Sequence, residues 1–197
     1  MDLGRVLARR RMVRRYLPDP VDPDALHRIL DRARRAPSAG NSQGQRFVVV
    51  RDAARRARIA ALCGEAQHVA AGRPPWLSTA PVHVVVCVRR ADYAERYAEP
   101  DKAAARGPEG WAVPFWWVDG GAALMLLLLA AVDEGLGAGL LDVADADGLR
   151  ALLAIPDDVS VLGLVTIGHP APGDRLPVGS ARRERRAFDG AVRYESW

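Results

Sequence analysis

Cysteine and histidine are scarce in this 197-residue sequence, and neither occurs in a metal-binding spacing. Cys63 and Cys87 allow at most one disulfide, the four histidines are scattered, and no CxxC, CxxH or HExxH motif is present. We therefore expect neither a zinc site nor a disulfide framework. No apolar segment typical of a signal peptide follows the N-terminal arginines. These absences predict a metal-free protein of the reducing cytoplasm.

Long hydrophobic runs are also missing. The longest one, GAALMLLLLAAV, covers residues 121–132, which is well short of the roughly 20 residues that span a bilayer. We therefore expect no membrane insertion, and we interpret this run as a helix buried in the core or between subunits. Hydrophobic residues make up 49% of the chain, which is enough for a single domain with a real core over residues 1–197.

Several motifs that would indicate a reaction are absent. The stretch GLGAG at residues 135–139 differs from the GxGxxG dinucleotide fingerprint, and it follows a helical pattern instead of opening one. We interpret it as a glycine-rich turn, not as a Rossmann site. Neither a P-loop motif nor a GxSxG nucleophile motif occurs, so nothing points to a P-loop NTPase or an α/β-hydrolase.

Apolar residues recur with helical spacing in several segments. Asp22 as the N-cap and Pro23 as the first helical residue predict a helix over residues 22–36. Further helices are expected at residues 1–10, at 53–72 with a glycine break, at 116–134 and at 145–155. Strands are expected at residues 46–50, 81–89 and 159–168. This order indicates one layered domain of the α+β or α/β class.

Two segments are too polar to form part of a core. Residues from about 93 to 110 resemble a flexible surface lid or arm. The tail SARRERRAFDGAVRYESW, residues 180–197, ends in aromatic residues. We expect this tail to be an arm that lies over another surface, such as a partner subunit.

Positive charge is carried almost entirely by arginine, since Lys102 is the only lysine. Five arginines fall within residues 9–15, and a second cluster lies near the C-terminus. One interpretation is a solvated face that reflects an arginine-rich composition. A second is a nucleic-acid surface, but only Tyr16 and Phe188 lie close enough to interleave as stacking aromatics, and no nucleic-acid module surrounds either cluster. We therefore expect no nucleic-acid partner.

A third interpretation is a site for a phosphate group. Guanidinium groups pair with two phosphate oxygens at once and stay charged at any working pH. Arg10 and Arg14 are four residues apart, a spacing that directs both side chains to one place in a helix end or tight turn. In the loop PSAGNSQ, residues 37–43, three side chains offer donors and acceptors that suit a planar heteroaromatic ring: Ser38, Asn41 and Gln43. Alone, this loop is equally typical of a plain connector.

Five segments in this order resemble the nitroreductase family of FMN-dependent flavoenzymes. They are RRRMVRRY…PV, APSAGNSQGQRFVVV, GAALMLLLLAAVDEGLGAGLLDV, LLAIPDDVSVLGLVTIGHPA and RRERRAFDGAVRYESW. The resemblance covers essentially the whole chain except residues from about 90 to 115, where the family varies. It implies an α+β fold of three layers, with a mostly antiparallel central sheet flanked by helices. It also implies an intertwined homodimer with FMN at each end of the interface.

The resemblance further implies a set of cofactor-binding residues. The FMN phosphate and the pyrimidine edge of the ring would be bound by the N-terminal motif, namely Arg10, Arg11, Met12 and Arg14, where Met12 replaces the usual Ser or Thr of the family. The other subunit would supply the loop residues Pro37, Ser38, Ala39, Asn41 and Gln43. Backbone atoms near the reactive flavin N5 would come from Leu140, Leu141, Asp142 and Val143. The late basic pair would be Arg183 and Arg185, with Arg186 as a one-step alternative.

The implied activity is ping-pong hydride transfer from NADH or NADPH, through flavin N5, to a small acceptor such as a nitroaromatic or a quinone. Arg14 is the candidate to stabilise negative charge at the N1/O2 edge, and no side-chain acid or base is required. The aromatic stretch WAVPFWW, residues 111–117, either walls the substrate slot or packs in the core. Other members of the family oxidise cyclic dipeptides or azolines, or fragment flavin itself. A non-redox anion-binding protein is the alternative from a different class.

Overall fold

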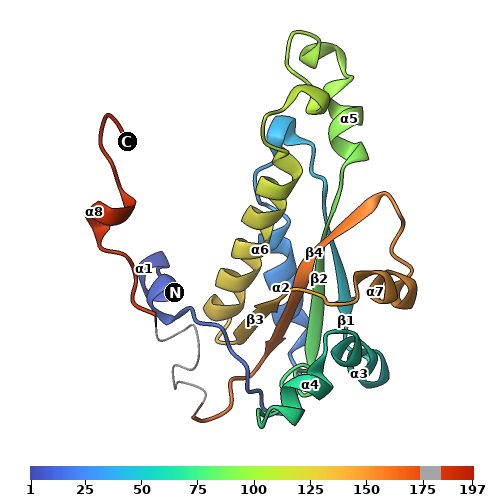
Figure 1. Ribbon diagram of the computed structural model, residues 1–197, viewed down its shortest axis with the longest axis vertical. Helices are drawn as coiled ribbons and strands as arrows, with labels where there is room; N and C mark the ends of the chain where they lie inside the picture. Colours follow the sequence, from blue (N-terminus) through green and yellow to red (C-terminus); the bar gives the residue numbers. More distant parts are fainter. Residues whose placement is uncertain (174–182) are drawn as a thin grey trace.

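The computed structural model describes residues 1–173 and 183–197, and its centre is a four-stranded sheet (Figure 1). The strand order is β1-β2-β4-β3, and every neighbouring pair is antiparallel. The strands are β1 (Gln45–Val50), β2 (Val82–Arg89), β3 (Gly137–Leu141) and β4 (Val159–Gly168). Residues 82–88 of β2 are all buried, because β2 is a central strand with helices on both of its faces. The sheet and its helices confirm the α+β class.

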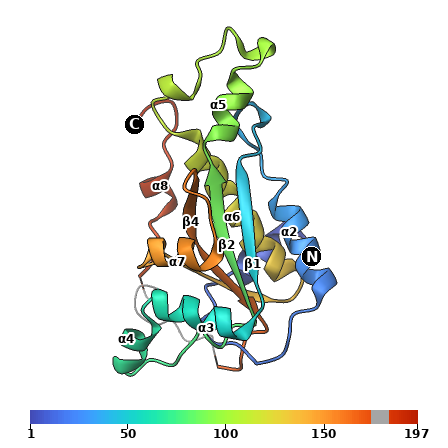
Figure 2. The same cartoon turned by 90° about the vertical axis from the view of Figure 1, so that its right-hand side faces the viewer.

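Helices cover both faces of this sheet and complete three layers (Figures 1 and 2). On one face, α2 (Pro23–Ala33) and α6 (Phe115–Asp133) pack against each other and against Val82, Val84 and Val86 of β2. On the other face lie α3 (Ala53–Leu62), α4 (Glu65–Ala70) and α7 (Ala146–Leu153). The valines of β2 alternate between the two core clusters, as the period of two in a strand requires.

The sequence predicted the start of α2 and the break between α3 and α4 correctly. The Asp22 carboxylate accepts hydrogen bonds from the Asp24 and Ala25 amides at 3.3 and 3.2 Å, and it thereby caps the helix that Pro23 begins. Gly64 separates α3 from α4 with a φ of +74°, a left-handed conformation that glycine adopts without penalty.

The prediction of a turn at GLGAG was correct for Gly135 and wrong for the residues from Gly137 onward. Only Gly135, with a φ of +80°, forms the turn after α6, and β3 begins at Gly137. The reason is a close approach from the other end of the chain. A Cβ atom on Gly137 would lie 2.6 Å from Val13 Cγ2, and one on Gly139 would lie 2.4 Å from the Val13 carbonyl oxygen. These two glycines therefore make room for another segment.

The stretch expected to be a flexible lid contains regular structure. Helix α5 (Ala91–Tyr97) is followed by 3-10 turns at Pro100–Lys102 and Pro108–Gly110. Tyr93 of α5 is fully buried, and its ring meets Trp111 and Trp116 edge-on at centroid distances of 6.0 and 6.3 Å. This segment therefore has an aromatic core of its own at one end of the sheet.

Helix α6 is longer than its apolar run. Among the residues that the structure describes, it alone is long and apolar enough, by length and composition, to cross a membrane. Its buried residues, such as Ala123, Leu127 and Ala131, pack on the sheet as those of a core helix do. Its other side leaves Trp117, Val118 and Met125 exposed.

Both ends of the chain lie at the surface. Helix α1 (Leu3–Arg9) buries only Val6, and Leu3 and Leu7 of its predicted apolar face are 65% and 52% exposed. The C-terminal segment contains α8 (Phe188–Ala191), and in both views it lies outside the body of the molecule (Figures 1 and 2). The first three residues of the predicted C-terminal arm, 180–182, fall outside the described residues.

Candidate functional site

The basic N-terminal segment is attached to the edge of the sheet. Met12 forms a parallel bridge with Ala138 of β3, and the Val13 amide donates to the Ala138 carbonyl oxygen at 2.9 Å. Tyr16 pairs with Pro170 just beyond β4, and its hydroxyl lies 2.7 Å from Thr166 Oγ1. These contacts fix the segment that carries the predicted phosphate-binding arginines, and they bring it beside the strand that leads to Leu140–Val143.

The end of β3 presents a mixture of exposed and buried residues. Leu140 and Leu141 are half-buried, Asp142 is exposed and Val143 is buried. The Val143 amide donates to Asp142 Oδ1 at 2.9 Å. Two of the predicted cofactor-binding groups, the one in the N-terminal segment and the one at the end of β3, are therefore neighbours in a single chain.

Arg14 stacks on an aromatic ring. Its guanidinium carbon lies 5.5 Å from the centroid of the Trp76 ring, which is a cation–π distance. Trp76 is only 6% exposed, and its ring also borders Gly139 of β3. The stack restricts the Arg14 side chain to one side of the segment, beside β3.

A buried carboxylate holds Trp76 in place. Glu65 Oε1 accepts hydrogen bonds from the backbone amides of Trp76 and Leu77 at 2.8 and 2.6 Å, and from Ser78 at 3.2 Å. Burial alone would raise the pKa of Glu65, but the hydrogen bonds from Ser78, Trp76 and Leu77 outweigh burial and lower it. Glu65 thus stays ionised while it fixes the turn under Arg14.

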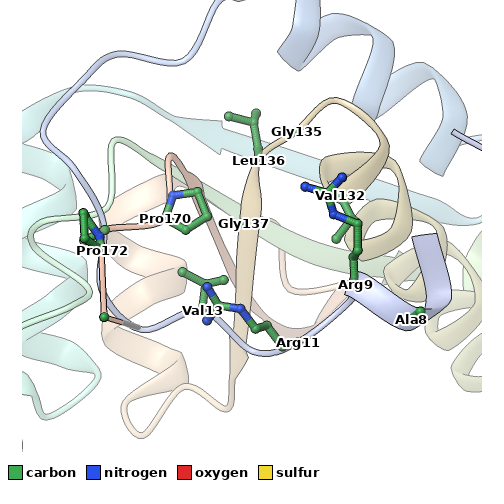
Figure 3. Close-up of a pocket in the computed structure, with 12 residues that line it drawn as sticks. Ala8, Arg9, Arg11, Val13, Val132, Gly135, Leu136, Gly137, Pro170 and Pro172 are labelled. Carbon is green, nitrogen blue, oxygen red and sulfur yellow. The ribbon is translucent and has the colours of Figure 1, made fainter. Parts of the chain in front are cut away.

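A pocket of about 600 Å³ opens on the N-terminal segment (Figure 3). Arg9 and Arg11 provide its charged lining, and the rest comes from the end of α6, the start of β3 and residues 170–173. Of the predicted residues, only Arg11 lines this pocket. Arg10, Met12 and Arg14 do not, because alternate residues of an extended segment face opposite ways. Arg9, the first residue of the segment RRRMVRRY, was not among the residues predicted to bind the cofactor.

The charge around this segment suits an anion. Several arginines elsewhere are paired with carboxylates, as in the ion pairs Arg28–Glu134 at 2.8 Å and Arg46–Asp92 at 2.6 Å. Arg10, by contrast, is half-buried and forms no ion pair within residues 1–173 and 183–197. A half-buried guanidinium without a carboxylate, close to further arginines, matches the donor set that a phosphate dianion requires. The residues present therefore fit a phosphate group.

The loop at residues 37–43 lies at the opposite end of α6. The Ala39 amide donates to Asp119 Oδ2 at 2.9 Å near the start of this helix, whereas the N-terminal segment packs on β3 beyond its end. From Asp119 to Asp133 the helix rises about 21 Å at 1.5 Å per residue. One chain therefore does not bring its own loop residues to its own arginines.

The loop has a compact and partly left-handed backbone. The Gln43 amide donates to Ser38 Oγ at 2.9 Å, and Asn41 and Gln43 both have positive φ values, +59° and +52°. Residues other than glycine adopt such conformations at a cost in free energy on the order of 1–3 kcal/mol each. The Asn41 and Gln43 residues are exposed, and Pro37 is exposed beside the half-buried Ser38 and Ala39.

The late basic pair is not near the other groups. Arg183 and Arg185, like the alternative Arg186, are exposed and belong to the C-terminal segment that lies outside the body of the molecule. The functional candidates missed from the sequence are Trp76 and Glu65. No local pattern marks either residue, because their role arises from contact with Arg14 and β3.

Comparisons with known proteins agree with this arrangement. A model of the nitroreductase family matches residues 7–169 of the chain. The sequence is 34% identical over 195 residues to an NADH dehydrogenase of Thermus thermophilus, and the alignment covers 90% of this chain and 93% of that protein. It is 33% identical over 194 residues to an FMN reductase (NAD(P)H) of Bacillus subtilis, covering 95% of this chain and 71% of that protein.

Solved structures show the same fold. The hypothetical oxidoreductase YcnD of Bacillus subtilis superposes with a TM-score of 0.77 at 27% identity, covering 100% of this chain and 75% of that one. A nitroreductase family protein of Streptococcus pneumoniae superposes with a TM-score of 0.76 at 22% identity, and the match covers 98% of this chain and 100% of that one. With the family model matching most of the chain and relatives above 30% identity over most of its length, this chain belongs to the nitroreductase family.

Proposed function

We propose that this protein is an FMN-dependent oxidoreductase that transfers hydride from NADH or NADPH, by a ping-pong mechanism, to a nitroaromatic, quinone or similar small acceptor. The observation that carries the proposal is the attachment of the N-terminal segment to β3. The Met12–Ala138 bridge brings the arginine-rich segment beside Leu140–Val143, and this proximity supports a phosphate site there. Relatives named NADH dehydrogenase and FMN reductase (NAD(P)H) support the redox chemistry and the nucleotide donor.

The roles of the side chains follow from their charge and position. Arg10 and Arg11 would hold the phosphate of FMN. Arg183 and Arg185 would join them in the dimer, where the C-terminal segment would lie over the partner subunit. Arg14, oriented by Trp76, would place positive charge at the pyrimidine edge and stabilise the negative charge that develops there on reduction. FMN, when bound, supplies the hydride acceptor and donor, so the protein contributes binding, orientation and electrostatics.

The site would be completed by a second copy of the chain. The loop at residues 37–43 and the N-terminal segment lie at opposite ends of α6, so a homodimer is the arrangement that joins them. Exposed apolar side chains are available for the interface on α6 and α1, namely Trp117, Val118, Met125, Leu3 and Leu7. Large exposed apolar surfaces mark association sites, so these side chains support the proposed interface.

The first experiment is an absorption spectrum of the purified protein, followed by anaerobic addition of NADPH and then NADH. We expect an oxidised flavin spectrum that bleaches with one or both nucleotides. A flavin spectrum that neither nucleotide bleaches would favour a second candidate, a flavin-dependent enzyme that tailors a small metabolite. That candidate has support from the 31% identity over 181 residues to a 5,6-dimethylbenzimidazole synthase of Rhodobacter capsulatus.

A protein that binds no flavin, even after incubation with FMN, would contradict both candidates. Steep salt-dependent DNA binding by such a protein would then support the non-redox anion-binding alternative.

A further inference from the structure

The loop at residues 37–44 has a conformation that its own sequence does not favour. Gly40, Asn41 and Gln43 all have positive φ values, between +52° and +62°. Glycine adopts this region freely and asparagine tolerates it, but glutamine does not. Within the loop, the internal restraints on the backbone include the Gln43 amide to Ser38 Oγ bond at 2.9 Å and the Ser42 hydroxyl bond to the Ala39 carbonyl at 2.6 Å. Contacts from outside the loop must therefore help to hold it.

The first external contact is a buried carboxylate in the first turns of α6. Asp119 is 6% exposed, and its Oδ2 atom accepts two hydrogen bonds, from the Ala39 amide at 2.9 Å and from the Tyr93 hydroxyl at 2.9 Å. Burial, together with the hydrogen bond to Asp119, raises the pKa of Tyr93 above its ordinary value, so the phenol stays a donor. Asp119 thus links the loop to α5 and α6 at one point.

The second external contact is helix α5. A Cβ atom on Gly44 would lie 2.4 Å from Tyr93 Cε2, and one on Gly40 would lie 2.8 Å from Tyr97 Cε2, so both loop glycines rest on tyrosine rings. The Arg96 Nε–H group donates to the Gly40 carbonyl oxygen at 2.8 Å, and Asp101 holds the Arg96 guanidinium at 2.7 Å. The backbone of the loop is therefore supported along its length.

We infer that Asp119 and Tyr93 are positioning residues, which hold the loop at residues 37–44 in the conformation that binds FMN. The inference rests on the proposed function, and it assigns a role to a part of the chain, α5 and the start of α6, that lies outside the motifs of the site. The group that touches the cofactor is the loop, and Asp119 and Tyr93 act through it. The simpler alternative is that this corner only stabilises the fold.

The test compares three variants by the Kd of the apoprotein for FMN, measured from the quenching of flavin fluorescence. Asp119→Ala removes the acceptor for Ala39 and Tyr93, and we expect FMN binding to weaken by about tenfold or more, the effect of one or more lost hydrogen bonds. Asp119→Asn keeps both bonds when its amide oxygen takes the position of Oδ2, because a carbonyl oxygen has two lone pairs and accepts from both the Ala39 amide and the Tyr93 hydroxyl. We expect its Kd to stay within about threefold of the wild-type value. Tyr93→Phe should fall between them.

A control separates positioning from loss of stability. Ile59→Val removes one methylene from the core cluster on the other face of the sheet, and a large-to-small substitution of this kind lowers the stability of the fold. We expect it to leave the Kd for FMN and the visible circular dichroism of the bound flavin unchanged. We expect Asp119→Ala to change both. If Asp119→Ala does not fold, Tyr93→Phe, which removes a single oxygen, carries the comparison.

The outcomes are distinct. If the wild-type protein binds FMN and the Asp119→Ala or Tyr93→Phe variant binds it with the same Kd, the positioning role is overturned and the proposed function is not. An Ile59→Val variant that weakens FMN binding as much as Asp119→Ala also overturns it, because stability would then explain the effect. Wild-type protein that binds no FMN overturns the proposed function together with the role built on it.

Discussion

The guanidinium carbon of Arg14 lies 5.5 Å from the centroid of the Trp76 ring, and the turn that carries Trp76 is held by the carboxylate of Glu65. An arginine that is restricted in this way loses less side-chain entropy when an anion binds. In the proposed site, Trp76 would therefore act on the cofactor through Arg14.

The stack predicts an energetic coupling between the two residues. Trp76→Leu should weaken FMN binding by about 2- to 30-fold, the range of a cation–π interaction of about 0.5–2 kcal/mol. Arg14→Ala should weaken it further, and the double variant should resemble Arg14→Ala alone. The measurement is a double-mutant cycle on the Kd for FMN. Strictly additive effects would mean that Trp76 does not act through Arg14.

Mixed dimers should reveal which chain supplies each half of the site. In a dimer of one Arg14→Ala subunit and one Asn41→Ala subunit, a loop that serves the partner places both changes in one site and leaves the other site intact. We expect one site of wild-type affinity per mixed dimer, measured by FMN titration of differently tagged, co-purified subunits. A loop that serves its own chain would leave two weakened sites and none of wild-type affinity.

His83 should make the stability of the fold depend on pH. It is fully buried on β2, its Nε2–H group donates to the Leu77 carbonyl oxygen at 2.8 Å, and Nδ1 has no partner in the described part of the chain. Burial lowers the pKa of His83 from 6.5 to about 4, with Arg56 lowering it and Glu65 and the Leu77 carbonyl opposing the shift. The folded state thus binds fewer protons than the unfolded state between these two values.

The contribution of His83 to the free energy of unfolding should therefore be complete above pH 6.5. It should fall by about 3 kcal/mol as the pH drops toward 4. The measurement is urea unfolding across this range, for wild type and for His83→Gln, which cannot be protonated. Carboxylates contribute equally to both proteins, so the difference isolates His83. Parallel pH profiles for the two proteins would refute its contribution.

The contact between Gly139 and the N-terminal segment gives a matched pair of variants. Gly139→Ala would place a methyl group 2.4 Å from the Val13 carbonyl oxygen and 2.9 Å from Trp76. It should lower the free energy of unfolding by about 1–3 kcal/mol and weaken FMN binding, since the arginine segment must shift. Gly107→Ala is the control, because the nearest atom to a Cβ there is Tyr97 Cβ at 4.0 Å. Gly107 has an extended backbone that alanine adopts freely, so this variant should be as stable as wild type or up to about 1 kcal/mol more stable.

Local sequence patterns predicted the elements whose cause is local. Asp22 and Pro23 located the start of α2, and the unbroken valine run located β2, because capping and strand propensity act over a few residues. The glycines of GLGAG were misinterpreted because their cause is Val13, a residue far away in the sequence. The same limit applies to the site. The arginine motif could be recognised, but Trp76 beneath Arg14 and Asp119 behind the loop depend on tertiary contacts alone.

The single lysine of the chain also has a practical consequence. Lys102 Nζ lies 5.6 Å from the centroid of the Tyr97 ring, the same ring that supports Gly40. The N-terminal amine, the other primary amine, is engaged by Asp133 on the opposite end of α6. An amine-reactive fluorophore therefore has one side-chain attachment point, directly beneath the loop at residues 37–44. A dye at this position would report the ordering of the loop optically, in the intact enzyme and without any engineered residue.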